Sequence, residues 1–316
     1  MNREVLTKAL ESVFEGIPEE KAGGRPFYKG KVRDIIDIGD KLIIATSDRI
    51  SAFDHVLTTI PFKGQVLNQM ALFWFNATAD ILKNHIVEEI TPRTVLVDKC
   101  EVLPVEVIVR GYLTGSAWRD YSKGNPVSGI TLPAGMKANQ RFSTPLITPS
   151  TKAEQGEHDL PISGEEIVSR GLVDADLWKQ VEEKSLALFA RGTEIAAKRG
   201  LILVDTKYEF GIKDGELRIV DEVHTPDSSR YWYADTYDEL FAKGEEQRKV
   251  DKEFLRKWLM DHNWMGDGAP PVIPEQTVVD VAEKYIAAYE TVTGEAFSGA
   301  PSTVDSELEA ISAYLS

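Results

Sequence analysis

The chain has 316 residues, which is longer than one hydrophobic core usually grows, so two domains or one domain with a large appendage are expected. Apolar residues make up 42% and charged residues 28%, as in folded globular proteins, and no apolar run has the length of a membrane-spanning helix. The formal net charge of −15 disfavours a polyanionic partner such as nucleic acid, although a small anionic ligand could still bind where arginines and lysines gather.

Cysteine content and the first residues favour the cytoplasm. Cys100 is the only cysteine, which excludes an intrachain disulfide or a cysteine metal cluster, and we interpret it as a buried small hydrophobic residue. Met1 to Glu4 lack the apolar core of a signal peptide and lead into Leu6 and Leu10 at helical spacing.

The first third of the chain favours a hairpin followed by a helix. Residues 31–38 and 41–46 are rich in β-forming residues and are joined at Gly39-Asp40. Leu67, Met70 and Trp74 then recur at helical spacing, so we interpret the aromatic cluster at 73–75 as core packing rather than a ligand stack.

The middle of the chain contains the expected domain boundary. Residues 102–109 resemble a strand interrupted by Pro104, which favours an edge strand or a connector. We therefore expect an N-terminal lobe over 1–104 and a C-terminal lobe over 105–316. Further elements are a loop-rich stretch with five prolines at 126–161, helical periodicity at 165–199, and amphipathic helices around 254–259 and 278–289.

The most informative segment is Asp205-Thr206-Lys207-Tyr208-Glu209-Phe210-Gly211, with Asp221-Glu222 further on. Asp214-Gly215 lies between them and tolerates positive φ, which predicts a tight hairpin. Lys207, Glu209 and Asp221 would then converge at one end of a sheet, where carboxylates hold Mg²⁺ and an ammonium group meets phosphate. The pattern indicates ATP chemistry, and the alternative is a charged hairpin that faces water.

The hairpin register conflicts with this convergence. If Asp214 and Gly215 are the two central residues, Glu209 pairs with Val220, and strict alternation sends Glu209 and Asp221 to opposite faces. We therefore predict irregular pairing, either a bulge, for which Gly211 is best suited, or a turn shifted by one residue.

Other polar segments could serve a nucleotide, although neither G-x-x-x-x-G-K-[ST] nor G-x-G-x-x-G after a strand is present. Alone, the basic residues at 28–34 could be an exposed turn, and Ser116 after the Arg110 strand could be a simple helix N-cap. Similar dense polar segments occupy residues 47–54, 149–159 and 225–232.

Together these segments resemble the SAICAR synthetase family (phosphoribosylaminoimidazole-succinocarboxamide synthase) in its longer single-function form. The matching blocks are GKVRDI, SDRISAFD, PFKGQVLNQMALFWF, LPVEVIVRGYLTGSAW, ITPSTKAEQGEHD, DTKYEFG and VDEVHTPDSSRYW, which occur in family order from about residue 28 to 232. The resemblance implies an α+β fold of two lobes, with an antiparallel N-terminal sheet over a larger α/β portion and ATP in the cleft between them.

The implied reaction joins L-aspartate to the carboxylate of carboxyaminoimidazole ribonucleotide (CAIR), with ATP becoming ADP and phosphate, in de novo purine biosynthesis. Because a carboxylate is a poor electrophile, phosphorylation by ATP would first give an acyl phosphate. The protein would mainly position three anions and offset their repulsion.

The resemblance also implies residue roles. The catalytic residues would be Lys207, Glu209 and Asp221, with Glu209 and Asp221 as Mg²⁺ ligands; ATP would contact Gly30, Lys31, Arg33, Glu101, Val102, Leu103 and Lys207; CAIR would contact Arg110, Ser116, Lys152, Asp159, Asp227 and Arg230; and aspartate would contact Asp48, Arg49 and Ser51.

The expected partners are therefore the small molecules ATP, CAIR and aspartate, without nucleic acid or membrane, and the chain would be a monomer or homodimer. A small-molecule kinase using the same ATP and Mg²⁺ residues is an alternative, and so is a nucleotide-sensing protein without turnover. ATP consumption that requires both CAIR and aspartate would separate the ligase from both.

Overall fold

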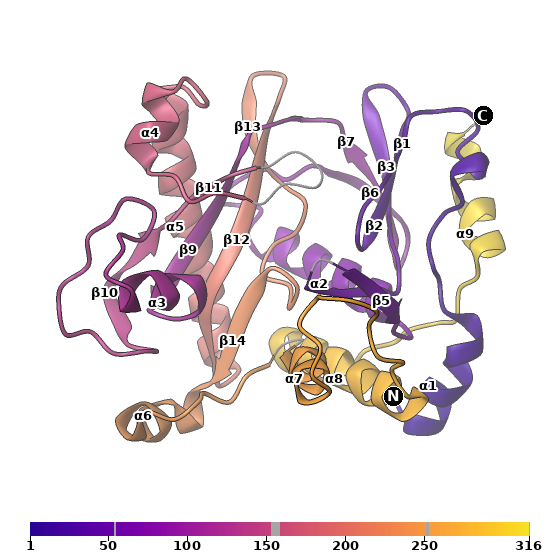
Figure 1. Ribbon diagram of the computed structural model, residues 1–316. Coiled ribbons are helices and arrows are strands. Elements are labelled where there is room, and N and C mark those ends of the chain that lie inside the picture. The colour runs from indigo at the N-terminus through magenta and orange to yellow at the C-terminus, as the bar shows by residue number, and fades with distance from the viewer. Residues whose placement is uncertain (54, 153–158, 251–252, 316) are drawn as a thin grey trace. The chain divides into compact units, whose positions relative to one another are not determined.

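The computed structural model describes residues 1–53, 55–152, 159–250 and 253–315. The chain forms two compact units (Figure 1): unit 1 comprises Met1–Phe73, His85–Lys99 and Asp251–Ser316, and unit 2 comprises Trp74–Asn84 and Cys100–Val250. The C-terminal helices thus group with the N-terminal sheet in unit 1. The expected division at 104/105 does not coincide with these units and stays a prediction about domains.

Unit 1 is built on an antiparallel sheet with the order β1-β2-β3-β7-β6. The bounds are Phe27–Lys29 for β1, Arg33–Asp37 for β2, Lys41–Thr46 for β3, Ile86–Thr91 for β6 and Thr94–Asp98 for β7. The predicted hairpin is confirmed, because β2 and β3 pair antiparallel from Arg33↔Thr46 to Asp37↔Leu42. A separate two-stranded sheet joins β4 (Arg49–Ala52) to β5 (His55–Thr59).

Both faces of the unit 1 sheet are covered by apolar side chains. Ile43 of β3 belongs to a buried cluster with Phe14 and with Ile311 of α9 (Val304–Ile311). The next residue, Ile44, lies in a second cluster against Leu72 of α2 (Lys63–Ala77). This alternation is what the period of a β-strand requires. Trp74 and Phe75 are buried, which confirms the core interpretation of the aromatic cluster.

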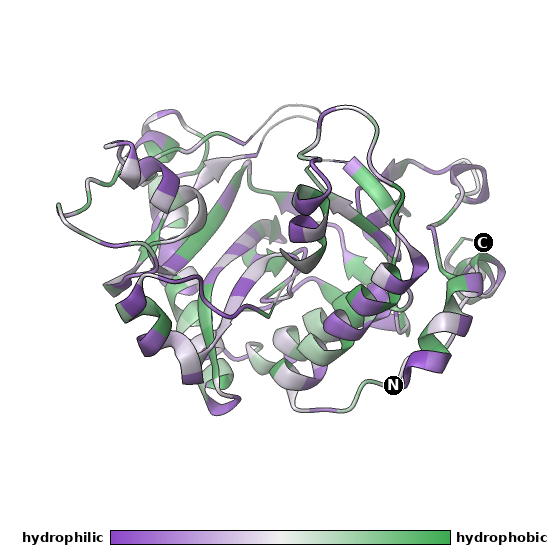
Figure 2. Cartoon of the chain, turned by 60° about the horizontal axis from the view of Figure 1, so that its bottom comes forward, coloured by the Kyte–Doolittle hydropathy of each residue, from purple (hydrophilic) through white to green (hydrophobic). Residues whose placement is uncertain are grey.

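The remaining helices of unit 1 are α1 (Arg3–Ala9), α7 (Glu253–Asp261) and α8 (Glu275–Thr293), and the two predicted C-terminal amphipathic helices are thereby confirmed. Arg3 of α1 forms ion pairs with Asp280 and Glu283 of α8. Figure 2 shows hydrophilic and hydrophobic residues interleaved along the helices, as expected where one side of a helix is buried. Among the described residues, no helix is long and apolar enough to cross a membrane.

Unit 2 contains an antiparallel sheet whose main path is β10-β9-β12-β13, with β11 on β9 and with β8 and β14 on β12. The bounds are Glu101–Val102 for β8, Val105–Tyr112 for β9, Arg141–Ile147 for β10, Ser150–Thr151 for β11, Leu201–Lys213 for β12, Glu216–Val220 for β13 and Ser229–Tyr233 for β14. The mixed fold with an antiparallel N-terminal sheet is therefore as expected. Pro104, however, separates β8 from β9, and β9 is an interior strand, so an edge position for residues 105–109 is wrong.

The described part of unit 2 also contains the α-helices α3 (Gly115–Ser122), α4 (Gly164–Ser169), α5 (Ala175–Lys198) and α6 (Ala234–Lys243). The helical periodicity predicted over 165–199 is divided between α4 and α5. Ser163 caps α4 and Asp174 caps α5 by accepting backbone N–H groups, and these two caps define separate helix starts. The long helix α5 packs on β12 and β9.

The β12–β13 hairpin shows how Glu209 and Asp221 meet. Its pairing is unbroken from Lys213↔Glu216 to Glu209↔Val220, and Gly211 pairs regularly with Arg218. Asp214 and Gly215 have φ of 54° and 75°, as a two-residue hairpin turn requires. The predicted irregular pairing is therefore wrong. Asp221 instead lies beyond the end of β13 with φ of 64°, so the alternation of the strand no longer directs its side chain.

Candidate functional site

A cluster of acidic residues surrounds Lys207 in unit 2. The Lys207 Nζ lies 3.1 Å from Glu106 Oε1 of β9 and 3.5 Å from Asp221 Oδ2, and it also pairs with Glu209 Oε1. The second carboxylate oxygen of Glu209 pairs with the Nζ of Lys152. The predicted convergence of Lys207, Glu209 and Asp221 is thus confirmed. We call Glu106, Lys152, Lys207, Glu209 and Asp221 the acidic cluster.

Burial and mutual charge determine the protonation of this cluster. Burial works to lower the pKa of Lys207, but the carboxylates of Asp221, Glu209 and Glu106 outweigh it and raise the pKa well above its usual value. Burial raises the pKa of Glu106, with the charges of Glu209 and Asp159 adding to the rise and Lys207 opposing it. Lys207 therefore stays an ammonium ion at neutral pH.

An arginine pair forms a second polar group in unit 2. Asp205 of β12 is paired in register with Arg110 of β9 on one side and with Arg230 of β14 on the other. One Asp205 oxygen lies 3.3 Å from Arg110 Nη1, and the other accepts a 3.0 Å bond from Arg230 Nε. Arg110 also donates to Thr148 Oγ1 at 2.8 Å and to Ser116 Oγ at 3.0 Å.

The arginine pair carries more positive charge than Asp205 neutralises. Burial lowers the pKa of Arg110; Asp205 opposes this effect, and the charge of Arg230 adds to it. Two guanidinium groups held by one carboxylate leave a net positive charge, which suits a phosphate because guanidinium groups match its oxygens bidentately.

The start of α3 lies against the arginine pair. Gly115 has φ of 60°, and a Cβ at this position would overlap the Arg230 guanidinium. Thr114, not Ser116, occupies the N-cap position, and Ser116 Oγ accepts a bond from Arg110. The N-cap alternative for Ser116 is therefore wrong.

One strand positions both groups. Asp205, Lys207 and Glu209 are every second residue of β12, so their side chains project from the same side of the strand. Tyr208 and Phe210 project from the other side and are fully buried. Four strand residues span about 13 Å. The side of β12 therefore presents cationic groups for a phosphate at one end and a lysine among carboxylates at the other, a separation that an elongated phosphorylated ligand could bridge.

The predicted ATP residues are divided between the units: Gly30, Lys31 and Arg33 belong to unit 1, and Glu101, Val102, Leu103 and Lys207 belong to unit 2. In unit 1, Gly30 N–H donates to Arg33 C=O at 2.8 Å and closes the turn between β1 and β2. In unit 2, Leu103 is buried and its N–H donates to Phe210 C=O at 2.8 Å, while Glu101 and Val102 are exposed.

Arg49, predicted to bind aspartate, holds this turn within unit 1. Its buried guanidinium pairs with Asp34 at 2.6 Å and donates to Gly30 C=O at 2.9 Å. Its Nε donates to the C=O of Lys31 at 3.3 Å. These contacts fix the backbone that carries the basic side chains of Lys31 and Arg33.

Asp48, also predicted to bind aspartate, is a structural acceptor in unit 1. It is 1% exposed, accepts the N–H groups of Phe14 and Gly64 at 2.8 and 2.9 Å, and pairs with Arg93 at 3.0 Å. Both carboxylate oxygens thus have protein partners. Ser51 is half-buried on β4. The aspartate assignment of these residues stays a prediction.

Two of the remaining predicted CAIR residues, Lys152 and Asp159, lie at the acidic cluster. Lys152 belongs to the acidic cluster, and Asp159 is close enough to raise the pKa of Glu106. Asp227 lies in the loop before β14, where its N–H donates to Thr225 Oγ1 at 3.3 Å. Residues 153–158 and Asp54, which belong to the predicted polar segments, lie outside the described residues.

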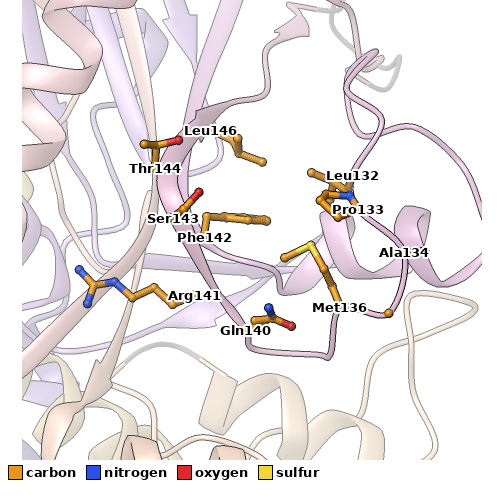
Figure 3. Close-up of a pocket in the computed structure, with 11 residues that line it drawn as sticks. Leu132, Pro133, Ala134, Met136, Gln140, Arg141, Phe142, Ser143, Thr144 and Leu146 are labelled. Carbon is orange, nitrogen blue, oxygen red and sulfur yellow. The ribbon is translucent and has the colours of Figure 1, made fainter.

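A separate, mostly apolar pocket lies between residues 132–136 and strand β10 (Figure 3). Figure 3 shows Phe142 and Leu146 of β10 facing Leu132 and Met136 across a common space, while Arg141 points away from it. None of the predicted site residues lines this pocket.

Sequence reasoning missed Glu106, Asp205 and Thr148 as members of these groups. Asp205 had a usable signal, since it begins the Asp-x-Lys-x-Glu alternation that places residues 205, 207 and 209 on one side of a strand. Glu106 and Thr148 had none, because only the pairing of β9 with β12 and β10 brings them to the site.

The fold and the two groups define a mixed α and β protein equipped to hold phosphorylated ligands beside carboxylates. A family profile described as SAICAR synthetase matches residues 26–271. Phosphoribosylaminoimidazole-succinocarboxamide synthase of Bacteroides fragilis is 51% identical over 296 residues, which cover 92% of this chain and 93% of the relative.

Solved structures show the same likeness. The SAICAR synthase of Saccharomyces cerevisiae complexed with SAICAR superposes with a TM-score of 0.80 at 36% identity, covering 91% of this chain and all of that one. A SAICAR synthetase in complex with ADP superposes with a TM-score of 0.66 at 27% identity, covering 87% of this chain and all of that one. The chain belongs to the SAICAR synthetase family.

Proposed function

We propose that this chain catalyses the ATP-dependent joining of L-aspartate to the carboxylate of CAIR, giving SAICAR, ADP and phosphate in purine biosynthesis. The roles proposed for the two polar groups rest on one observation. The arginine pair beside Asp205 and the acidic cluster around Lys207 lie on the same side of β12. The membership of the chain in the SAICAR synthetase family supports the reaction itself.

The chemistry has two steps. A carboxylate oxygen of CAIR attacks the γ-phosphorus of ATP, the bond from that phosphorus to the bridging oxygen breaks, and ADP leaves. The aspartate amine then attacks the acyl carbon, phosphate leaves with the bonding electrons, and the nitrogen loses a proton. Most of the catalytic effect comes from positioning and charge stabilisation, because no group of the protein is covalently modified.

The arginine pair binds the phosphate of CAIR in this proposal. Arg110 and Arg230 are held by Asp205, so both guanidinium groups are oriented before the ligand arrives. Ser116 and the start of α3 add polar contacts beside them. Such preorganisation lowers the entropy cost of binding. The imidazole carboxylate of CAIR then points along β12 toward the acidic cluster, near Lys152 and Asp159, and Asp227 completes the set of CAIR contacts.

The acidic cluster serves the transferring phosphoryl group. Lys207 remains protonated and offers its ammonium group to phosphate oxygens, while Glu209 and Asp221 would hold Mg²⁺. Their carboxylate oxygens already converge on one cation, Lys207, and hard oxygen donors suit Mg²⁺. When bound, Mg²⁺ would neutralise charge on the ATP phosphates.

Lys31 and Arg33 contact the ATP phosphates from the turn that Arg49 holds, with Gly30 allowing close approach of the backbone, and the segment Glu101, Val102 and Leu103 accommodates adenine. Asp48, Arg49 and Ser51 remain the candidates for aspartate, with Asp48 and Arg49 held in place by their protein partners. The enzyme works in the cytoplasm on small molecules, as a monomer or homodimer.

A coupled assay for ADP tests the function, with CAIR and aspartate each omitted in turn. We expect ADP at full rate only when both are present, together with an amide product that has the combined mass of CAIR and aspartate minus water. ADP formation at full rate without aspartate, with phosphate transferred to a hydroxyl acceptor, would instead identify a small-molecule kinase.

A further inference from the structure

The carboxylates assigned to the metal are already neutralised by the protein. Lys207 Nζ lies among Glu106, Glu209 and Asp221, and Lys152 pairs with the outer oxygen of Glu209. Within residues 1–53, 55–152, 159–250 and 253–315, no group of three or more His, Cys, Asp or Glu residues is arranged to hold a metal ion. The ammonium group of Lys207 occupies the place on which these oxygens converge.

A divalent cation and the Lys207 ammonium group compete for the same oxygens. Each Glu209 oxygen has a lysine partner, so a metal that binds Glu209 meets the positive charge of at least one of these lysines and competes with it for the carboxylate. The attraction between opposite charges a few ångströms apart is strong at a partly buried site, and Lys207 is only about one-quarter exposed. Once displaced from Glu209 and Asp221, Lys207 keeps Glu106 as a partner, and a bound phosphate would supply the anionic contacts that it has lost.

We propose that Lys207 is an internal counter-ion of the metal site, which a divalent cation must displace from Glu209 and Asp221, so that metal binding is weak until a phosphate group accepts the lysine. This inference rests on the proposed function, because it takes Glu209 and Asp221 as the metal ligands. It predicts a coupled exchange of partners. Glu209 and Asp221 lose their contacts with Lys207 and bind the metal, and Lys207 binds the phosphate.

Titration with Mn²⁺ in the absence of nucleotide tests the competition without any catalysis. Bound Mn²⁺ loses the electron paramagnetic resonance signal of the free ion, so the free fraction is measured directly. We expect Lys207→Met to bind Mn²⁺ at least about tenfold more tightly than the wild type, because the competing charge is gone. Lys83→Met removes an exposed lysine that pairs with Glu216 in the same unit, and it should leave the affinity unchanged.

A second measurement uses the wild-type protein and so does not depend on whether the Lys207 variant folds. Lysines are labelled with a limiting amine reagent and quantified by peptide mass spectrometry, with and without Mn²⁺ at a concentration that saturates the wild-type site. We expect Mn²⁺ to increase labelling of Lys207 relative to Lys83, and adding ADP to protect Lys207 again.

Equal Mn²⁺ affinity of wild type and Lys207→Met, or unchanged labelling of Lys207, would overturn the inference. The variant Glu209→Gln shows whether such a result disproves only the competition or also the assignment of Glu209 as a metal ligand. If Glu209→Gln abolishes Mn²⁺ binding while Lys207→Met leaves it unchanged, the proposed metal role stands and the competition is wrong. If Glu209→Gln binds Mn²⁺ as the wild type does, the metal ligands themselves are misassigned, and the inference falls with them.

Discussion

Glu209 is the residue whose charge the proposed chemistry uses most directly, since its two oxygens contact Lys207 and Lys152. We predict that Glu209→Gln lowers kcat by on the order of a hundredfold or more, the typical loss when one charge-stabilising group is removed. The melting temperature should change little, because Glu106 and Asp221 still neutralise Lys207. Steady-state kinetics and a thermal melt of the same preparation check both parts.

Glu216→Gln is the matched control, because Glu216 lies on the same hairpin, is exposed and pairs with Lys83. It should leave kcat unchanged. A Glu209→Gln enzyme with a near-normal kcat would remove Glu209 from the catalytic machinery.

Arg110 and Arg230 differ from lysine in a way that a phosphate ligand would detect. A guanidinium group offers two parallel donors to phosphate oxygens, whereas an ammonium group is a point charge. We predict that Arg230→Lys raises the KM for CAIR by on the order of tenfold or more, with a much smaller change in the KM for ATP. Initial rates measured against each substrate in turn distinguish the two effects.

The half-buried Arg191, which pairs with Asp80, provides the control for Arg230, and Arg191→Lys should change neither KM. If Arg230→Lys weakened ATP and spared CAIR, the two substrate sites would have to be exchanged in the proposal.

At the scale of secondary-structure elements, the β12–β13 hairpin shows both what a sequence can predict and what it misses. Asp214-Gly215 is a local signal, so the hairpin itself followed from the turn chemistry, whereas the irregular pairing predicted for it was wrong. The convergence of Glu209 with Asp221 was also correct, but its cause was not a bulge. A single left-handed residue after the strand, Asp221, redirects one carboxylate, and strand periodicity carries no information about it.

The loop between β13 and β14 is held by a buried hydrogen bond. Tyr208 Oη lies 2.5 Å from His224 Nε2, and both side chains are fully buried. Burial lowers the pKa of His224 to about 3 from its usual 6.5. The folded protein therefore keeps His224 neutral over a range in which the unfolded chain binds a proton, so stability falls as the pH drops from 6.5 toward 3.

We predict that His224→Gln flattens this part of the stability profile. Each proton taken up only by the unfolded state changes the free energy of unfolding by about 1.4 kcal/mol per pH unit. Below pH 6.5, the free energy of unfolding of the wild type should therefore fall more steeply with decreasing pH than that of the variant. The difference between the two slopes should reach up to about 1.4 kcal/mol per pH unit. Urea unfolding between pH 5 and 7.5 measures it, with the exposed His262→Gln as the control that keeps the wild-type slope. Identical slopes for wild type and His224→Gln would contradict the prediction.

At the scale of the whole molecule, the sequence predicted helices and strands better than it predicted their grouping. The amphipathic helices at the C-terminus followed from apolar periodicity, but their membership in unit 1 depends on contacts between residues far apart in the sequence. Gln65, for example, donates to Ala300 C=O at 2.6 Å, and Arg93 donates to Ser302 Oγ at 2.8 Å. No local signal marks such partners, because each residue alone resembles an ordinary surface or helix-end residue.

Glu307 on α9 makes further long-range contacts within unit 1. Its carboxylate is 2% exposed, accepts the hydroxyl groups of Thr91 and Thr94 at 2.7 and 2.8 Å, and lies 3.7 Å from Arg93 Nε. Removing a buried acceptor leaves its donors unsatisfied, and hydrogen bonds to charged groups contribute about 1.5–3 kcal/mol each. The last helix therefore stabilises the sheet built from the first hundred residues.

We predict that Glu307→Ala lowers the free energy of unfolding by about 2 kcal/mol or more, measured by urea denaturation. Glu309→Ala, on the same helix but exposed, should stay within about 0.5 kcal/mol of the wild type, as is usual for surface substitutions. Because Glu307 lies in unit 1 and the acidic cluster lies in unit 2, the residual folded enzyme should keep its kcat when assayed below the unfolding transition. Equal stability of the two variants would show that α9 is not tied to the sheet through Glu307.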